Sequence, residues 1–256
     1  MTKEKICFSN AGYRGLLEKI LESGYSIAPL RESFLNNDLT VILRHDVDFS
    51  VDFALEMALI EKELGVRSTF FFMITCDYYN VLSEENRNAL NKIASLGHEI
   101  GLHWDSRFMP NKRDEQVEFF NSQLRILSSV IGESIQSVSQ HIPTDTPNFD
   151  IDPLVNFNAY SKRINDKYRY VSDSSMVWRE HTPLDFIADR ASFQFLAHPI
   201  WWIAEGVNQT EKIRNFVRSL DGHATCHAEK YIIYMNEVLE NRSKFDENFR
   251  ISRELK

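Results

Sequence analysis

Two aspartates that are one residue apart could do chemistry together. They lie in the segment Arg44-His45-Asp46-Val47-Asp48. On an extended backbone, residues two apart share a face, so the carboxylates of Asp46 and Asp48 point the same way and His45 points the other way. Two adjacent carboxylates do not both ionise readily unless a cation lies between them or one holds a proton. The pair therefore suits a site in which one aspartate binds a metal ion and the other is a general base. A turn with two solvated aspartates is the alternative that this spacing leaves open.

A second segment, residues 97–105 (GHEIGLHWD), contains a candidate imidazole ligand. Gly101, His103 and Asp105 share one face of an extended strand. The glycine permits a close backbone approach beneath His103. His103 is thus a candidate metal ligand and Asp105 a possible further one. The alternative is a hydrogen-bonded histidine that belongs to the core.

A third segment, residues 195–202 (FLAHPIWW), is an apolar run that ends in His198 and is followed by two tryptophans. A histidine in this position could protonate a leaving group. Trp201 or Trp202 could stack on the apolar face of a sugar ring. The alternative is that both tryptophans fill the core.

These residues need elements that bring them together, and the hydrophobic pattern alternates between strands and helices. An alternating pattern predicts parallel strands with helical crossovers. In such folds the active site lies at the carboxyl ends of the strands. His141 follows a further expected strand, and with Asp46, Asp48, His103 and His198 it should therefore lie at one end of the sheet. We expect strands over residues 39–43, 68–74, 98–103, 137–140, 168–172 and 193–197. We expect helices over residues 11–23, 51–64, 84–96, 114–131, 208–220 and 228–240. An irregular region should follow the strand over 137–140 and extend to about residue 167.

Composition favours one compact domain over residues 1–256, with a helical extension over 1–38. The chain is 43% hydrophobic and 26% charged, which is close to the globular average. Its net charge of -8 argues against a nucleic-acid partner. The three cysteines are odd in number and form no CxxC pair, which fits a reducing compartment. With no apolar core of a signal peptide and no membrane-length apolar run, we expect a soluble cytoplasmic protein.

Together these segments resemble the polysaccharide deacetylase, or NodB-homology, family. The resemblance covers the aspartate pair, then residues 65–71 (GVRSTFF), then 97–103 (GHEIGLH) and then 196–198 (LAH), in that order. The RHDVD and GLHWD forms, YVSDS at 170–174 and HPIWW at 198–202 look like a branch found in bacterial surface-polysaccharide biosynthesis clusters. The resemblance implies a distorted (β/α) barrel of about seven parallel strands. It also implies hydrolysis of an N-acetyl group on an amino sugar.

The resemblance implies roles for four residues. Asp46 matches the catalytic base, Asp48 the metal-binding aspartate and His103 the first metal-binding histidine. His198 matches the general acid. One divalent metal ion, Zn²⁺ first among the candidates, would lower the pKa of water and polarise the acetyl carbonyl.

One expected ligand is missing. The family places a second metal histidine four residues after His103, and this chain has Arg107 there, which cannot ligate a cation. Catalytic zinc sites usually have three protein ligands. Asp105 and His141 are the available substitutes. His141 also falls in the region of the family's Arg-x-Pro motif, whose arginine orients the catalytic aspartate, so it could be a ligand, a base-orienting residue or a substrate contact.

The remaining expectations concern the substrate. Arg44, Asp173 and the two tryptophans are expected to contact it, although Asp173 could instead hold His141 or His198 in place. A cytoplasmic location favours a nucleotide- or lipid-linked N-acetylated sugar over a finished polymer. Two other functions stay open. One is hydrolysis of a different C–N bond on the same fold, and the other is sugar binding by a non-catalytic relative that has lost its metal.

Overall fold

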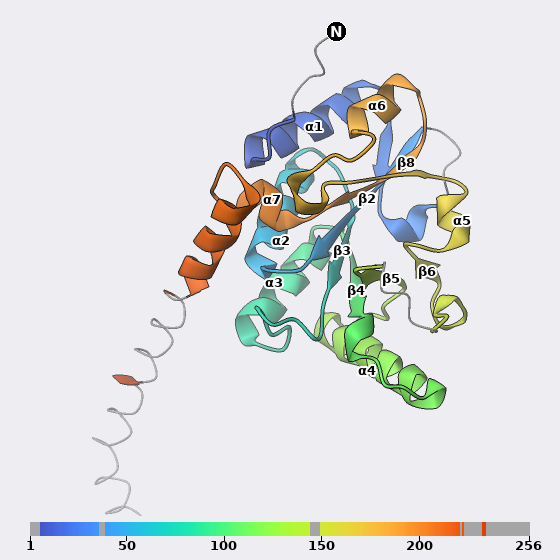
Figure 1. The fold of residues 1–256 in the computed structure, drawn as a ribbon, viewed down its shortest axis with the longest axis vertical. Coiled ribbons are helices and arrows are strands. Elements are labelled where there is room, and N and C mark those ends of the chain that lie inside the picture. The colour runs from blue at the N-terminus through green and yellow to red at the C-terminus, as the bar shows by residue number, and fades with distance from the viewer. Residues whose placement is uncertain (1–5, 36–38, 144–148, 221, 223–231, 234–256) are drawn as a thin grey trace, which may run out of the picture.

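The computed structural model describes residues 6–35, 39–143, 149–220, 222 and 232–233. A parallel sheet runs through the middle of the molecule, and helices pack along its outer side (Figure 1). The strands are β1 (Ser26–Ala28), β2 (Thr40–Val47), β3 (Thr69–Phe72), β4 (Glu99–Asp105), β5 (Ser137–His141), β6 (Phe157–Asn158), β7 (Arg169–Ser172) and β8 (Phe193–Ala197).

The strands are ordered β6-β5-β4-β3-β2-β8-β7, and every pairing among them is parallel. The short strand β1 adds to the beginning of β2, below the point where β3 joins it. The curled sheet and its helices form a single α/β domain. The predicted fold, a distorted (β/α) barrel of about seven parallel strands, is confirmed.

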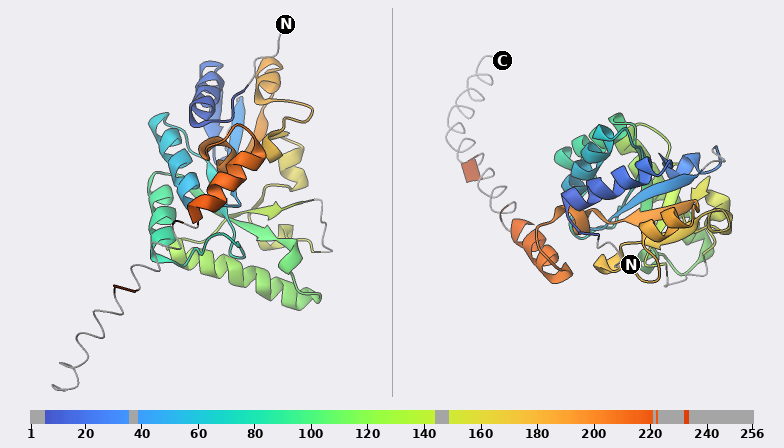
Figure 2. Two further views of the ribbon diagram at one scale, coloured as in Figure 1. Left: turned by 60° about the vertical axis from the view of Figure 1, so that its left-hand side comes forward. Right: turned by 90° about the horizontal axis from the view of Figure 1, so that it is seen from above.

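The helices follow one another around the outside of the sheet. Helix α1 contacts α2, α2 contacts α3 and α3 contacts α4, and Figure 2 shows this succession from two further sides. None of the described helices is long and apolar enough to cross a membrane. The helices are α1 (Asn10–Glu22), α2 (Val51–Glu63), α3 (Glu84–Ser95), α4 (Arg113–Ile131), α5 (Lys162–Asn165), α6 (Pro183–Ala188) and α7 (Pro199–Ile203), followed by helical residues 209–220.

The central strands are buried on both faces, which explains why β3 and β8 are mostly apolar. All four residues of β3 and all five of β8 are buried. Close packing at β4 depends on Gly101. A Cβ added there would lie 2.4 Å from the Phe71 ring and 2.8 Å from the carbonyl oxygen of Ser137. The glycine thus allows three strands to approach each other beneath His103.

Two strands extend further than their sequence pattern indicates. The polar residues after Leu43 suggest that β2 ends there, yet the strand continues to Val47 because β3 pairs with residues 44–47. Similarly, β4 continues to Asp105 by pairing with β5. Asp46 and His103 therefore lie inside the ends of their strands rather than after them.

Several short elements have too few residues to produce a recognisable pattern. These are β1, β6, α5, α6 and α7, of which β6 and α5 fall in the region expected to be irregular. The helix expected over residues 228–240 lies outside the described residues.

Candidate active site

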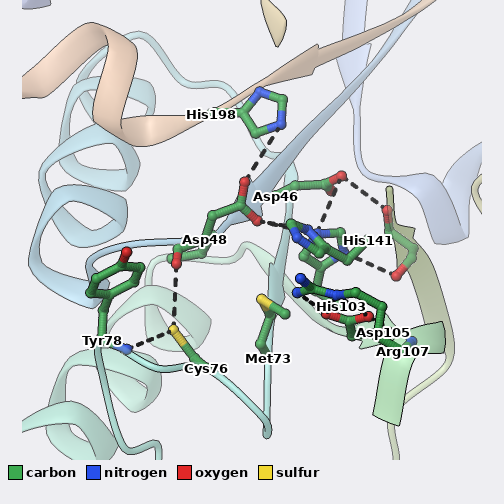
Figure 3. A network of polar contacts seen from close by, with 12 residues as sticks. Asp46, Asp48, Met73, Cys76, Tyr78, His103, Asp105, Arg107, His141 and His198 are labelled. Atoms are coloured by element: carbon green, nitrogen blue, oxygen red, sulfur yellow. Dashed lines mark hydrogen bonds and ion pairs between the residues drawn. The ribbon is translucent and has the colours of Figure 1, made fainter. Parts of the chain in front are cut away.

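Three metal-ligand-type side chains converge at the carboxyl end of the sheet (Figure 3). Asp48 follows β2, His103 lies near the end of β4 and His141 ends β5. The Asp48 Oδ1 atom is 3.2 Å from His103 Nε2 and 3.4 Å from His141 Nδ1. The two imidazole nitrogens are 3.2 Å apart.

These distances are those expected of atoms that share a small cation. Two ligand atoms about 2.0–2.1 Å from a tetrahedral zinc ion lie roughly 3.3–3.4 Å from each other. The Asp48 Oδ1 atom is also buried without a hydrogen-bond partner, which is costly for a carboxylate oxygen unless a cation meets it. Two nitrogens and one oxygen form a donor set that suits Zn²⁺. The residues present therefore fit a divalent metal ion.

His103 is held in the tautomer that a metal ligand needs. Its Nδ1–H donates to the carbonyl oxygen of Ser139 at 3.0 Å, which leaves the lone pair of Nε2 directed at Asp48. Burial raises the pKa of Asp48, but the neighbouring imidazoles of His103 and His141 outweigh burial and keep it well below its usual range. Asp48 is therefore ionised, as a metal ligand must be.

Arg107, which stands where a second metal histidine was expected, pairs with Asp105. Its Nε lies 3.1 Å from Asp105 Oδ1 and 3.0 Å from Oδ2, and its backbone N–H also donates to Oδ1. The guanidinium is half exposed, so its charge is directed toward solvent. Both Asp105 oxygens are thereby engaged, and the ligand cluster contains His141 instead. The geometry thus favours His141 over Asp105 as the third ligand.

Asp46 is held beside this cluster by two residues beneath it. Arg44 Nη1 donates to Asp46 Oδ1 at 3.1 Å, and Ser139 Oγ donates to Oδ2 at 3.1 Å. Asp46 Oδ2 lies 3.9 Å from His103 Nε2. The expectation that Arg44 contacts substrate is wrong, because its side chain is fully buried and packs 4.6 Å over the Tyr160 ring. Arg44 orients Asp46, a role that the sequence left open for His141.

His198 lies on another side of the cluster, with its Nε2 3.9 Å from Asp48 Oδ2. Its Nδ1–H donates to Asp173 Oδ1 at 2.6 Å, and its backbone N–H donates to the same carboxylate. Burial alone lowers the pKa of His198. The charge and hydrogen bond of Asp173, with smaller contributions from Asp48 and Asp46, outweigh burial and raise the pKa to about 9. The imidazole is therefore protonated near neutral pH.

Two further expected substrate contacts are corrected by burial. Asp173 is fully buried and accepts hydrogen bonds from His198 and from the indole N–H of Trp202, so it holds His198 in place. Trp202 is 1% exposed and packs against Phe8 and Tyr13, so it cannot stack on a sugar. Trp201 does line the pocket above the site.

His45 points away from the aspartates, as strand alternation predicts. Its Nε2 lies 2.6 Å from Glu61 Oε1 in α2, and its Nδ1–H donates to the carbonyl oxygen of Ala197. This carbonyl directly precedes His198. The outer face of β2 is thereby fixed to α2 and to the end of β8, while its inner face holds the site.

The site opens into a pocket of about 660 Å³. Several residues that line the pocket or support the site beneath it were missed from the sequence. Tyr160 lies in the region expected to be irregular, where no periodicity could indicate it. Ser139 had a signal, because it shares a strand face with His141. The pocket is lined by the candidate residues Asp46, Asp48, His103, His141, His198 and Trp201, and also by Tyr160, Tyr170, Ser172, Ser174, Ser175, Arg179, Glu180 and His181, among others.

No family model matches the chain, and no curated protein matches its sequence. Several solved deacetylase structures do match. A CE4 family pseudoenzyme from Bacillus anthracis is 15% identical over 73% of this chain, with a TM-score of 0.43. The chitin deacetylase of Colletotrichum lindemuthianum is 17% identical over 70% of this chain and 81% of its own, with a TM-score of 0.43. The peptidoglycan deacetylase of Bacillus subtilis is 16% identical over 73% of this chain and 85% of its own, with a TM-score of 0.42.

This chain spans 62% of the length of the B. anthracis protein, which is less than two thirds of it. All of these likenesses are distant. Functional conclusions for this chain therefore rest on its own residues and their geometry.

Proposed function

We propose that this protein is a metal-dependent hydrolase that removes an N-acetyl group from an amino sugar. The observation that carries the proposal is the spacing of Asp48, His103 and His141, whose ligand atoms lie 3.2–3.4 Å apart. A base candidate and an acid candidate, Asp46 and His198, each lie 3.9 Å from a different member of this cluster. Metal-dependent amide hydrolysis uses a metal ion, a general base and a general acid, and this site offers candidates for all three.

When bound, a divalent ion such as Zn²⁺ supplies Lewis-acid chemistry, polarising the acetyl carbonyl and making water more acidic. Asp46 accepts the proton of the attacking water. Arg44 and Ser139 fix the orientation of the Asp46 carboxylate, so its oxygen is aimed before substrate arrives. Both supporting side chains are buried, which excludes water that would compete for the same carboxylate.

His198 completes the reaction by protonating the leaving nitrogen. With a pKa of about 9 it carries the proton near neutral pH, and Asp173 holds it by Nδ1 so that Nε2–H faces the cluster. The C–N bond breaks as the amine takes this proton. The products are acetate and the free amino sugar, and the proton taken by Asp46 balances the one that His198 gives.

The pocket favours a sugar over a peptide or a simple amide. Tyr160, Tyr170 and Trp201 line it, and aromatic side chains of this kind stack on the apolar faces of sugar rings. We take the substrate to be a precursor of a bacterial surface polysaccharide, linked to a nucleotide or a lipid and encountered in the cytoplasm. The three cysteines, which form no CxxC pair, support a reducing setting such as the cytoplasm.

Acetate release from N-acetylated sugars tests the proposal. The metal-loaded protein should release one acetate per free amine formed, and Asp46→Asn should abolish release while leaving the metal bound. A matched control is Asp105→Asn. This variant changes a carboxylate on the same strand face as His103 that lies outside the ligand cluster, and it should retain most activity. Release from formamides or cyclic amides, with none from N-acetyl sugars, would reassign the substrate to another C–N bond. Retained activity in Asp46→Asn would refute the base assignment.

A further inference from the structure

The pocket over the candidate active site reaches beyond the atoms that hydrolyse an acetyl group. Its volume of about 660 Å³ lies in the range of sites that enclose a whole small-molecule ligand. One side of it is formed by the segment after β7, which we call the 172–181 wall. The wall residues that line the pocket are Ser172, Ser174, Ser175, Arg179, Glu180 and His181. A substrate that fills the pocket therefore contacts this wall with a part other than its acetyl group.

Arg179 is the single arginine or lysine among the described residues that line the pocket. Its side chain is exposed, and within the described part of the chain it makes no hydrogen bond or ion pair, even with the adjacent Glu180. The arginines nearest the ligand cluster are already paired, Arg44 with Asp46 and Arg107 with Asp105. Apart from protonated His198 and the proposed metal ion, Arg179 is thus the cation that the pocket lining offers to a ligand.

The backbone of the wall is unusual near Arg179. Ser175 and Met176 are consecutive non-glycine residues with φ of 58° and 55°. Such left-handed conformations cost energy and persist where the surrounding structure enforces them, often at ligand sites. Ser172 and Ser174 brace the same turn through hydroxyls 2.6 Å apart. The wall therefore contributes Ser174, Ser175 and the unpaired Arg179 to the lining of the same pocket.

Because the protein is negatively charged, an unpaired cation in its pocket indicates which kind of substrate binds there. The protein carries a net charge of -8, and the proposed metal ion and protonated His198 offset negative charge only at Asp46 and Asp48, not at the 172–181 wall. An anionic substrate would be repelled by this field unless a local cation received it. A neutral sugar could accept hydrogen bonds from the guanidinium, but only an anionic group would also pair with its charge. The planar fork of arginine matches the oxygens of phosphate and carboxylate groups.

We propose that Arg179, with the hydroxyls of Ser174 and Ser175, binds an anionic group that the substrate carries in addition to its N-acetyl group. This inference deepens the proposed function and rests on it for the identity of the sugar. It names the substrate class as an N-acetylated sugar bearing a phosphate, as in nucleotide- or lipid-linked forms, or a carboxylate, as in uronic acids. Arg179 is a specificity-determining residue and takes no part in bond breaking.

Calorimetry tests the anion site without requiring turnover. The full-length protein, with its metal, is titrated with UDP and with glucuronic acid, and compared with Arg179→Gln and Glu180→Gln. We expect the wild type to bind one of the two probes and Arg179→Gln to weaken that binding by about 10–100-fold, the value of a charge-assisted hydrogen bond. Glu180→Gln, which removes the neighbouring negative charge, should bind equally or more tightly. Equal binding by the wild type and Arg179→Gln, or no binding of either probe, overturns the anion site.

Acetate release from a matched pair of substrates gives the second test. Arg179→Gln should raise KM for UDP-N-acetylglucosamine by about tenfold or more and change kcat/KM for neutral N-acetylglucosamine by less than about twofold. Arg87→Gln, an exposed substitution on α3 that does not line the pocket, should affect neither. An equal loss on both sugars would show a structural role for Arg179 and refute the proposal. If neither sugar releases acetate, the proposed function fails, and calorimetry still decides the anion site.

Discussion

Replacing Asp173 by asparagine should remove the charge that keeps His198 protonated. Asparagine retains an oxygen that can accept from Nδ1, so the ring stays oriented while the negative charge is lost. The ordinary histidine pKa of 6.5 and the value of about 9 for His198 differ by an amount worth about 3 kcal/mol. Burial opposes that rise, and Asp173 is the largest contribution in its favour. We therefore expect the pKa of His198 in Asp173→Asn to fall well below 9.

An NMR titration of the imidazole resonances in metal-free protein measures this directly. The wild type should titrate near 9. Trp202→Phe is a matched control, since it removes the other side-chain hydrogen bond to Asp173 and leaves the charge in place. It should titrate close to the wild type. An Asp173→Asn variant that titrates within about half a pH unit of the wild type would refute the electrostatic assignment.

The same pair has a signature in stability. Because the folded pKa of His198 is raised, its contribution to the free energy of unfolding is fully present below pH 6.5 and is lost as pH rises through about 9. The stability difference between the wild type and Asp173→Asn should therefore be larger at pH 6 than at pH 10. Urea unfolding at the two pH values measures it, and a difference independent of pH would contradict the linkage.

Further substitutions test the supports of the site. Arg44→Met should leave the buried Asp46 carboxylate without its cation, which should cost about 3–5 kcal/mol of unfolding free energy. It should lower kcat by at least about tenfold while the metal still binds. An unchanged kcat would show that Arg44 does not orient the base. Gly101→Ala places a Cβ 2.4 Å from the Phe71 ring. Thermal unfolding should show that the free energy of unfolding falls by about 1–3 kcal/mol. An unchanged melting temperature would contradict the close approach of these strands.

The positions of the site residues along the chain were predictable because each lies near the end of a segment that the sequence pattern identifies as a strand. Asp48, His103, His141 and His198 lie near or just beyond the carboxyl ends of β2, β4, β5 and β8, respectively. In a parallel sheet these ends meet at one edge. The parallel pairing of the strands followed from the alternation of strands and helices. The face to which His45 points followed from the alternation of side chains along one strand.

The partners of the buried charges were not predictable. Arg44 is buried because it packs over Tyr160, a residue of a region without periodicity. Trp202 can be buried because its indole N–H donates a hydrogen bond to Asp173, which lies twenty-nine residues away in the chain. Pairs of this kind depend on distances between segments, which spacing along one strand does not encode.

The local pair of Asp105 and Arg107 shows a different difficulty. Its members are close in sequence, yet sequence could not tell whether the guanidinium would face the ligand cluster or turn back on its own carboxylate. The short helical turn over Ser106–Phe108 decides it, because it brings the Arg107 backbone N–H onto Asp105 Oδ1.

The central claim is that Asp48, His103 and His141 together hold a divalent metal ion, and zinc stoichiometry with X-ray absorption spectroscopy of the full chain tests it most directly. The wild type should bind one zinc ion through nitrogen and oxygen ligands that include two imidazoles. His141→Ala should weaken zinc binding by at least about tenfold and lose one imidazole from the spectrum, whereas Asp105→Ala should leave both unchanged. The assignment would be contradicted if His141→Ala still bound zinc fully through two imidazoles. It would also be contradicted if Asp105→Ala lost zinc binding.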